Sequence, residues 1–222
     1  MLFPGGIEAT PNATLLFSVA AAIIYLLTVD MGPTLSRTAV KTLSILLLAG
    51  LAITQDAPWL LLLALLLSAA GDAFLSRDGE LPFMAGLVSF LAAHLAYIVL
   101  FLGNGEGLGL LAGEPWRAAL ALLLVLFAVA MLFVLWRPVG SDLRPPVATY
   151  MVALLAMALA ALTMRLPLVV CGALLFMASD AMLAWEKFVA RPQASYRPLM
   201  RRAVWITYYG AQLAIVLAFV LA

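Results

Sequence analysis

The chain has 222 residues, of which 66% are hydrophobic and only 10% are charged. Together with a mean hydropathy of +1.15, this composition excludes an ordinary soluble globular protein and indicates an all-α, polytopic membrane protein. The formal net charge of +1, with no block of like charges, gives no reason to expect a nucleic-acid partner.

Apolar runs of the length that crosses a hydrocarbon core recur eight times along the chain. They predict a bundle of eight transmembrane helices that forms a single integral membrane domain over residues 1–222. The segment before the first run contains Glu8 and no Lys or Arg, unlike a secretory signal peptide, so we interpret that run as a retained helix. The predicted helices lie near residues 13–29, 37–54, 58–76, 82–102, 116–136, 145–163, 167–188 and 201–222.

The basic residues are distributed unevenly between the two predicted sides of the membrane. Of the 12 Lys and Arg residues, ten lie at the odd-numbered connections, and only Arg117 and Arg165 lie on the other side. Because cytoplasmic loops are enriched in Lys and Arg, the odd-numbered connections are predicted to be cytoplasmic. Both termini are then on the non-cytoplasmic side of a multi-pass protein, which in a bacterium would lie in the inner (plasma) membrane.

Two segments that each contain an aspartate resemble one another. LSAAGDAFLS at 67–76 and LFMASDAMLA at 175–184 share five of ten residues, and they place Asp72 and Asp180 on the third and seventh predicted helices. The match is consistent with a parallel four-plus-four repeat, of the kind that membrane proteins use to build a site between halves. The alternative is chance similarity between two helices rich in Leu and Ala.

A few polar side chains lie within the predicted helices, where a charged group costs roughly 2.5–3.5 kcal/mol and normally faces the bundle interior. Counted from the basic ends at 1.5 Å per residue, the lysine, the two aspartates and the first tyrosine of the Tyr208–Tyr209 pair lie about 6–12 Å deep. One pocket that opens toward the cytoplasmic leaflet could collect them. The residues are Lys41, Asp72, His94, Tyr150, Asp180, Tyr208, Tyr209 and Gln212.

Structural roles compete with functional ones for most of these residues. Lys41 can snorkel to the interface or pair with Asp72, and His94 can form an interhelical hydrogen bond. Tyr208 and Gln212 can join helices in the same way, and the aromatic stripe that ends at Tyr97 can be helix packing. Two carboxylates at similar depth are harder to explain by packing alone.

A pair of carboxylates can share a proton, so that one donates while the other stays ionised. This suits either the hydrolysis of an acid-labile bond or a proton relay in a transporter. The single cysteine, Cys171, excludes a disulfide or a thiolate metal cluster within one chain.

The polar residues fall into motifs with a fixed order along the chain. These are Lys41, then S-x-x-G-D-x-x-L at 68–75, F-x-x-G-x-x-x-F-x-x-x-H-x-x-Y at 83–97, Tyr150 with Met157, G-x-x-x-F-x-x-S-D-x-x-L at 172–183, and T-Y-Y-x-A-Q at 207–212. In these motifs the chain resembles the YhhN family of membrane proteins, which includes the lysoplasmalogenases. Lys41 is followed by Thr where many members have Pro, and residues 103–117 and the first helix match no family motif.

The resemblance implies an eight-helix enzyme that hydrolyses the vinyl ether bond of lysoplasmalogens, which are lysophospholipids in the membrane, to a fatty aldehyde and a glycerophospho-base. Asp72 and Asp180 are then the catalytic residues, with Asp180 as the acid and Asp72 as the base. No metal or organic cofactor is expected. The rival interpretations are a proton-coupled transporter of a lipid or small amphiphile, and a non-catalytic lipid-binding protein.

The resemblance also implies a set of substrate-binding residues around the aspartates. His94, Tyr208, Tyr209 and Gln212 would orient water or the glycerol hydroxyl. Lys41, helped by Arg77 or by Arg201 and Arg202, would hold the phosphate, or Lys41 would instead act on Asp72 as an ion-pair partner. Tyr97, Tyr150 and Ser179 complete the predicted binding set. The sequence does not indicate head-group preference or oligomeric state.

Overall fold

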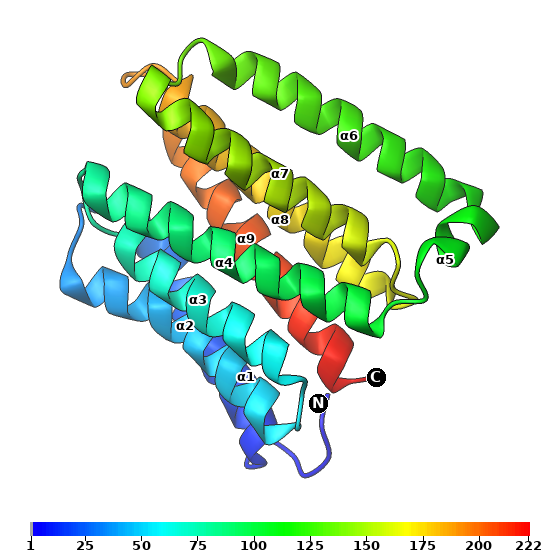
Figure 1. The fold of residues 1–222 in the computed structure, drawn as a ribbon. Helices are drawn as coiled ribbons and strands as arrows, with labels where there is room; N and C mark the ends of the chain where they lie inside the picture. Colours follow the sequence, from blue (N-terminus) through cyan, green and yellow to red (C-terminus); the bar gives the residue numbers. More distant parts are fainter. Residues whose placement is uncertain (1) are drawn as a thin grey trace. The chain divides into compact units, whose positions relative to one another are not determined.

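The computed structural model describes residues 2–222, and over these residues it contains nine α-helices and one short 3₁₀ helix (Figure 1). The ends of the eight long helices lie within about four residues of those predicted from hydropathy. The elements are α1 (Thr10–Thr28), α2 (Leu35–Thr54), α3 (Trp59–Leu75), α4 (Glu80–Asn104), α5 (Leu108–Gly113), α6 (Pro115–Trp136), η1 (Ser141–Leu143), α7 (Arg144–Ala161), α8 (Pro167–Phe188) and α9 (Arg197–Val220).

Seven helices within the described residues are long and apolar enough to cross a membrane. The chain is therefore a multi-pass integral membrane protein. The third predicted span, α3, is apolar but has 17 residues, at the short end of the range for a transmembrane helix. An eighth span, the repeat and the orientation of the termini stay predictions.

Proline and threonine residues explain several of the helix starts. Pro115 and Pro167 are the first residues of α6 and α8, where the missing N–H is not needed for an intrahelical hydrogen bond. Thr34 caps α2, because its hydroxyl oxygen accepts a hydrogen bond from the Arg37 backbone N–H at 3.2 Å. These residues define the first residues of the helices more closely than hydropathy alone does.

The chain divides into two compact units. The first comprises Met1–Tyr97 with Ile215–Ala222, and the second comprises Ile98–Ala214. In the first unit α1 packs against α2, and α2 packs against α3; in the second, α7 packs against both α6 and α8 (Figure 1). Each unit contains one of the two aspartates. The single membrane domain inferred from sequence stays a prediction.

Close packing of α3 and α4 in the first unit depends on two glycines. A Cβ added to Gly71 would lie 2.6 Å from the Phe90 ring, and one added to Gly86 would lie 2.6 Å from Leu75. A hydrogen bond from the Ser89 hydroxyl to the Leu67 carbonyl, at 2.7 Å, also joins these helices. Small residues allow helix backbones to approach closely in membranes, so Gly71 sets the position of its neighbour Asp72.

Gly71→Ala is expected to destabilise the protein by about 1–3 kcal/mol, because the rigid Phe90 ring cannot yield to the added methyl group without shifting a helix. Chemical unfolding in detergent measures the change. Gly50→Ala on α2 is the matched control, since its Cβ would meet Thr14 at an ordinary contact distance of 3.8 Å. Equal stability of the two variants would contradict the packing role of Gly71.

The segment 103–117, which matches no family motif, is ordered against the connection between α7 and α8. The backbone N–H of Glu106 donates to the Thr163 carbonyl at 2.9 Å, and the Glu106 carboxylate accepts a hydrogen bond from Arg165. This hydrogen bond lowers the pKa of Glu106 from its usual value. This Gly-rich segment thus contains the short helix α5 and a fixed contact within the second unit.

Arg117 holds the start of α6 in place. Its guanidinium donates to the Leu162 and Met164 carbonyls at 2.8 and 2.9 Å, just beyond α7, and to the Glu114 carboxylate at 2.9 Å. Carbonyls at a helix C-terminus lack intrahelical partners, so a buried arginine satisfies them well. Both basic residues assigned to the non-cytoplasmic side, Arg117 and Arg165, are therefore paired with glutamates.

Candidate functional site

Asp72 on α3 forms a buried ion pair with Lys41 on α2. Lys41 Nζ lies 2.9 Å from Asp72 Oδ1, and the two side chains are 13% and 1% exposed. A carboxylate this deeply buried is normally stabilised by an opposite charge or by hydrogen bonds. Of the roles considered for Lys41, the pairing with Asp72 is present in the structure.

An aromatic residue on α1 also lies beside this pair. The Tyr25 ring lies 5.6 Å from Lys41 Nζ and 5.7 Å from the Arg37 guanidinium carbon, within cation–π range. Tyr25 is itself buried. Sequence reasoning found no motif in the first helix and missed Tyr25. The signal that could have identified it is a hydroxyl-bearing aromatic side chain between aliphatic residues.

Two of the predicted binding residues lie on α4 in the same unit. His94 and Tyr97 are both completely buried. His94 Nδ1 lies 2.6 Å from the Phe90 carbonyl one turn earlier, and because a carbonyl only accepts, Nδ1 is the donor of this hydrogen bond. On α3, one turn before Asp72, the buried Ser68 hydroxyl has no hydrogen-bond partner among the described residues.

Asp180 on α8 accepts a short hydrogen bond from Tyr150 on α7. The distance from Tyr150 Oη to Asp180 Oδ2 is 2.6 Å. Both side chains are partly buried. Hydrogen bonds from a hydroxyl to a carboxylate are short and strong. The structure therefore brings together Tyr150 and Asp180, which sequence reasoning selected separately.

An aromatic cluster lies next to this pair, where α8 packs against α9. The Ser179 hydroxyl donates to the Val204 carbonyl at 2.9 Å, which fixes α8 against α9. The Phe176 and Tyr208 rings meet edge to face at 5.5 Å, and Trp205 contacts both Tyr208 and Tyr209. Gln212, one turn beyond Tyr208, is completely buried.

The two aspartates thus have chemically different surroundings. Asp72 faces an ammonium group, which stabilises the ionised carboxylate. Asp180 accepts a hydrogen bond from a neutral phenol and is more accessible. The difference suits two carboxylates with different roles in proton transfer. Among the residues that the structure describes, no group of three or more His, Cys, Asp or Glu could hold a metal ion.

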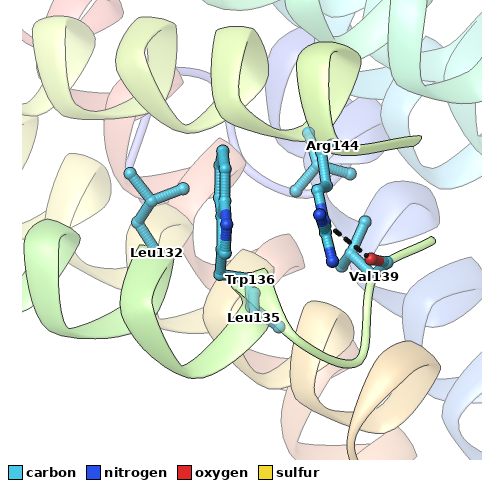
Figure 2. A pocket seen from close by; sticks show the side chains of 6 residues that line it. Leu132, Leu135, Trp136, Val139 and Arg144 are labelled. Atoms are coloured by element: carbon cyan, nitrogen blue, oxygen red, sulfur yellow. Dashed lines mark hydrogen bonds between the residues drawn. The ribbon is translucent and has the colours of Figure 1, made fainter. Parts of the chain in front are cut away.

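A small pocket elsewhere in the second unit is mostly apolar. It lies at the cytoplasmic ends predicted for α6 and α7 (Figure 2). Arg144 Nε donates to the Val139 carbonyl at 3.2 Å, and the Arg144 guanidinium stacks 5.4 Å from the Trp136 ring. None of the predicted site residues lines it; the lining residues are Leu132, Leu135, Trp136, Val139, Arg144 and Val147.

A comparison with known protein families matches the part of the chain that contains almost all of the residues described above. A model described as the YhhN family matches residues 36–219, which include both aspartates and all of the predicted binding residues. The chain belongs to the YhhN family. The match begins at the start of α2, so it includes the Lys41–Asp72 pair but leaves out Tyr25 on α1.

Curated relatives from Mycobacterium bovis and human are both named lysoplasmalogenase. The chain is 33% identical over 196 residues to a protein of Mycobacterium bovis named lysoplasmalogenase, with 85% of this chain and 72% of that protein covered. It is 34% identical over 183 residues to human lysoplasmalogenase TMEM86B, with 81% and 73% covered. No solved structure matches the chain significantly.

Proposed function

We propose that this YhhN family member is an enzyme that hydrolyses the vinyl ether bond of lysoplasmalogens. The observation that carries the proposal is its similarity to proteins named lysoplasmalogenase, at 33–34% identity over more than four fifths of the chain. The substrate would be a lysophospholipid taken from the membrane, and the products a fatty aldehyde and a glycerophospho-base.

The chemistry of a vinyl ether explains why carboxylates suit this reaction. Protonation of the β-carbon gives an oxocarbenium ion, and water adds to its carbon and loses a proton. The resulting hemiacetal then breaks its bond to the glycerol oxygen, which takes up a proton, and releases the aldehyde. A general acid, a group that stabilises the cation and a base for water are all that the sequence of steps requires.

The two aspartates are proposed to divide these tasks. Asp180, which accepts a hydrogen bond from neutral Tyr150, is assigned as the acid that protonates carbon. Asp72, beside the Lys41 ammonium, is assigned as the ionised group that stabilises the cation and activates water. The ion pair supports a role for Lys41 in holding Asp72 ionised, in place of the phosphate contact that the family resemblance suggested.

The other polar residues are proposed to orient the reactants. His94, Tyr208, Tyr209 and Gln212 are assigned to water or the glycerol hydroxyl, and Tyr97 and Ser179 to the walls of the binding site. The buried Ser68 hydroxyl, one turn from Asp72, is suited to hold a water molecule, because a buried polar group requires a partner.

Purified protein in detergent, supplied with a vinyl-ether lysophospholipid and with its alkyl-ether analogue, tests the proposal. We expect aldehyde release from the vinyl ether alone, since an alkyl ether cannot be protonated at carbon. Aldehyde from neither lipid, together with proton-driven movement of intact lipid across proteoliposomes, would instead establish the transporter and overturn the enzyme.

Tyr150→Phe is expected to lower kcat by about 10- to 100-fold, because it removes the hydrogen bond that orients Asp180. The aldehyde-release assay measures the change. Tyr196→Phe, at an exposed tyrosine before α9, is the matched control and should retain full turnover. Unchanged kcat in Tyr150→Phe would remove Tyr150 from the proposed mechanism.

A further inference from the structure

A buried glutamate near the end of α8 organises a basic cluster in the second unit. The Glu186 side chain is 10% exposed and lies 3.3 Å from Arg197 Nη2 and 3.7 Å from Arg201 Nε. It is the single acidic residue in the segment 186–202. The basic residues of this segment are Lys187, Arg191, Arg197, Arg201 and Arg202. One carboxylate thus lies in a segment with a large excess of positive charge.

The two arginines that contact Glu186 do different things. Arg197 also donates to the Glu186 and Ala190 carbonyls at 3.1 and 3.3 Å, so it is used to close the end of α8. Arg201 contacts Glu186 through Nε, and its side chain is 40% exposed. A guanidinium that is anchored on one side and accessible on the other is well suited to bind a phosphate.

The spacing between this cluster and Asp180 matches the length of the proposed substrate. Glu186 lies six residues after Asp180 on the same helix, which is about 9 Å along the axis. Seven bonds separate the vinyl ether β-carbon of a lysoplasmalogen from its phosphorus, which is about 8 Å at the ~1.2 Å per bond of an extended chain. The hydrogen bond from Ser179 to the Val204 carbonyl joins α9 to α8 beside Asp180, and the 3.7 Å contact with Glu186 places the Arg201 guanidinium near the level of Glu186.

We propose that Arg201, held by Glu186, binds the phosphate of the lysophospholipid while its vinyl ether lies at Asp180. This inference rests on the proposed function, and it selects Arg201 among the basic residues that the family resemblance suggested for the phosphate. It also supplies a phosphate-binding cation in place of Lys41, which pairs with Asp72.

The test compares two vinyl-ether substrates that differ only in the phosphate group. One is a lysoplasmalogen with a phosphoethanolamine head group, and the other is the corresponding 1-alkenyl glycerol. Arg201→Gln is expected to raise KM about 10-fold or more for the first and to leave KM for the second unchanged, with kcat within about twofold for both. Arg201→Lys should restore part of the loss. Arg191→Gln, at an exposed arginine of the same connection, is the matched control and should behave as wild type.

Equal changes for the two substrates, or no change for either, would overturn the phosphate role of Arg201. Failure of the wild-type protein to release aldehyde from either substrate would instead overturn the proposed function. In that event, the dissociation constant of the uncleavable alkyl-ether lysophospholipid decides the inference separately. A rise of about 10-fold in Arg201→Gln supports the phosphate site, and an unchanged constant contradicts it.

Discussion

Asp180→Asn is expected to lower kcat for aldehyde release by about 10²- to 10⁴-fold, the range typical for loss of a general acid. The asparagine has the shape of the aspartate, and its carbonyl oxygen can still accept the Tyr150 hydrogen bond that the structure shows. It cannot deliver the proton that the vinyl ether carbon requires. Turnover at saturating substrate separates this chemical effect from weaker binding.

The control for this variant is Asp142→Asn, which changes an exposed aspartate on η1 in the same unit. It should retain full turnover. Asp72→Asn is expected to reduce kcat in the same range, because the ionised group beside Lys41 is lost. Near-normal turnover of either variant, with an unchanged thermal transition in detergent, would contradict the division of tasks between the two carboxylates.

Lys41→Met is expected to destabilise the protein by about 3–5 kcal/mol, the typical cost of leaving a buried charge without its partner. The Asp72 side chain is 1% exposed, so solvent cannot replace the ammonium group. Chemical unfolding in detergent measures the loss. We expect turnover to fall as well, because Asp72 loses the ammonium group that lies beside it.

Two further variants make this result specific. Lys187→Met changes an exposed lysine at the end of α8 and should cost within about 0.5 kcal/mol. The double variant Lys41→Met with Asp72→Asn should recover much of the lost stability, since no unpaired charge remains. If Lys41→Met were no more destabilising than Lys187→Met, the ion pair would not contribute to the fold.

The positions of the long helices were predictable because the signal is long and redundant. Each long helix corresponds to an apolar run of about 17–22 residues in the sequence, and Pro115 and Pro167 stand at the first position of α6 and α8. The short helix α5 was missed, since six residues in a Gly-rich segment carry no comparable pattern. Its place depends on tertiary contacts such as the one between Glu106 and Thr163.

Sequence reasoning selects candidate site residues, but apart from the pairing of Lys41 with Asp72 it does not indicate their partners. Charges within apolar helices identify Lys41, Asp72 and Asp180, because the membrane makes each of them costly. Which neighbour each one faces depends on how the helices rotate about their axes, and hydropathy does not report this. The Tyr150–Asp180 hydrogen bond and the contact of Tyr25 with Lys41 therefore emerged only from the structure.

The burial of Glu186 could not be predicted from the sequence either. Near a helix end and beside Lys187, it reads as an ordinary surface charge in the sequence. The structure buries it between α8 and α9 and pairs it with Arg197 and Arg201. Burial at a helix end depends on how the chain returns after the connection, which no local pattern specifies.

Hydrolysis in D₂O tests the central claim most directly. Protonation of the vinyl ether at its β-carbon predicts that the released aldehyde, trapped as it forms and analysed by mass spectrometry, carries one deuterium at the carbon next to the carbonyl. Unlabelled aldehyde added to the same reaction controls for later exchange at that carbon. Aldehyde without deuterium at that position, or no aldehyde from a folded protein, would contradict acid-catalysed vinyl ether hydrolysis.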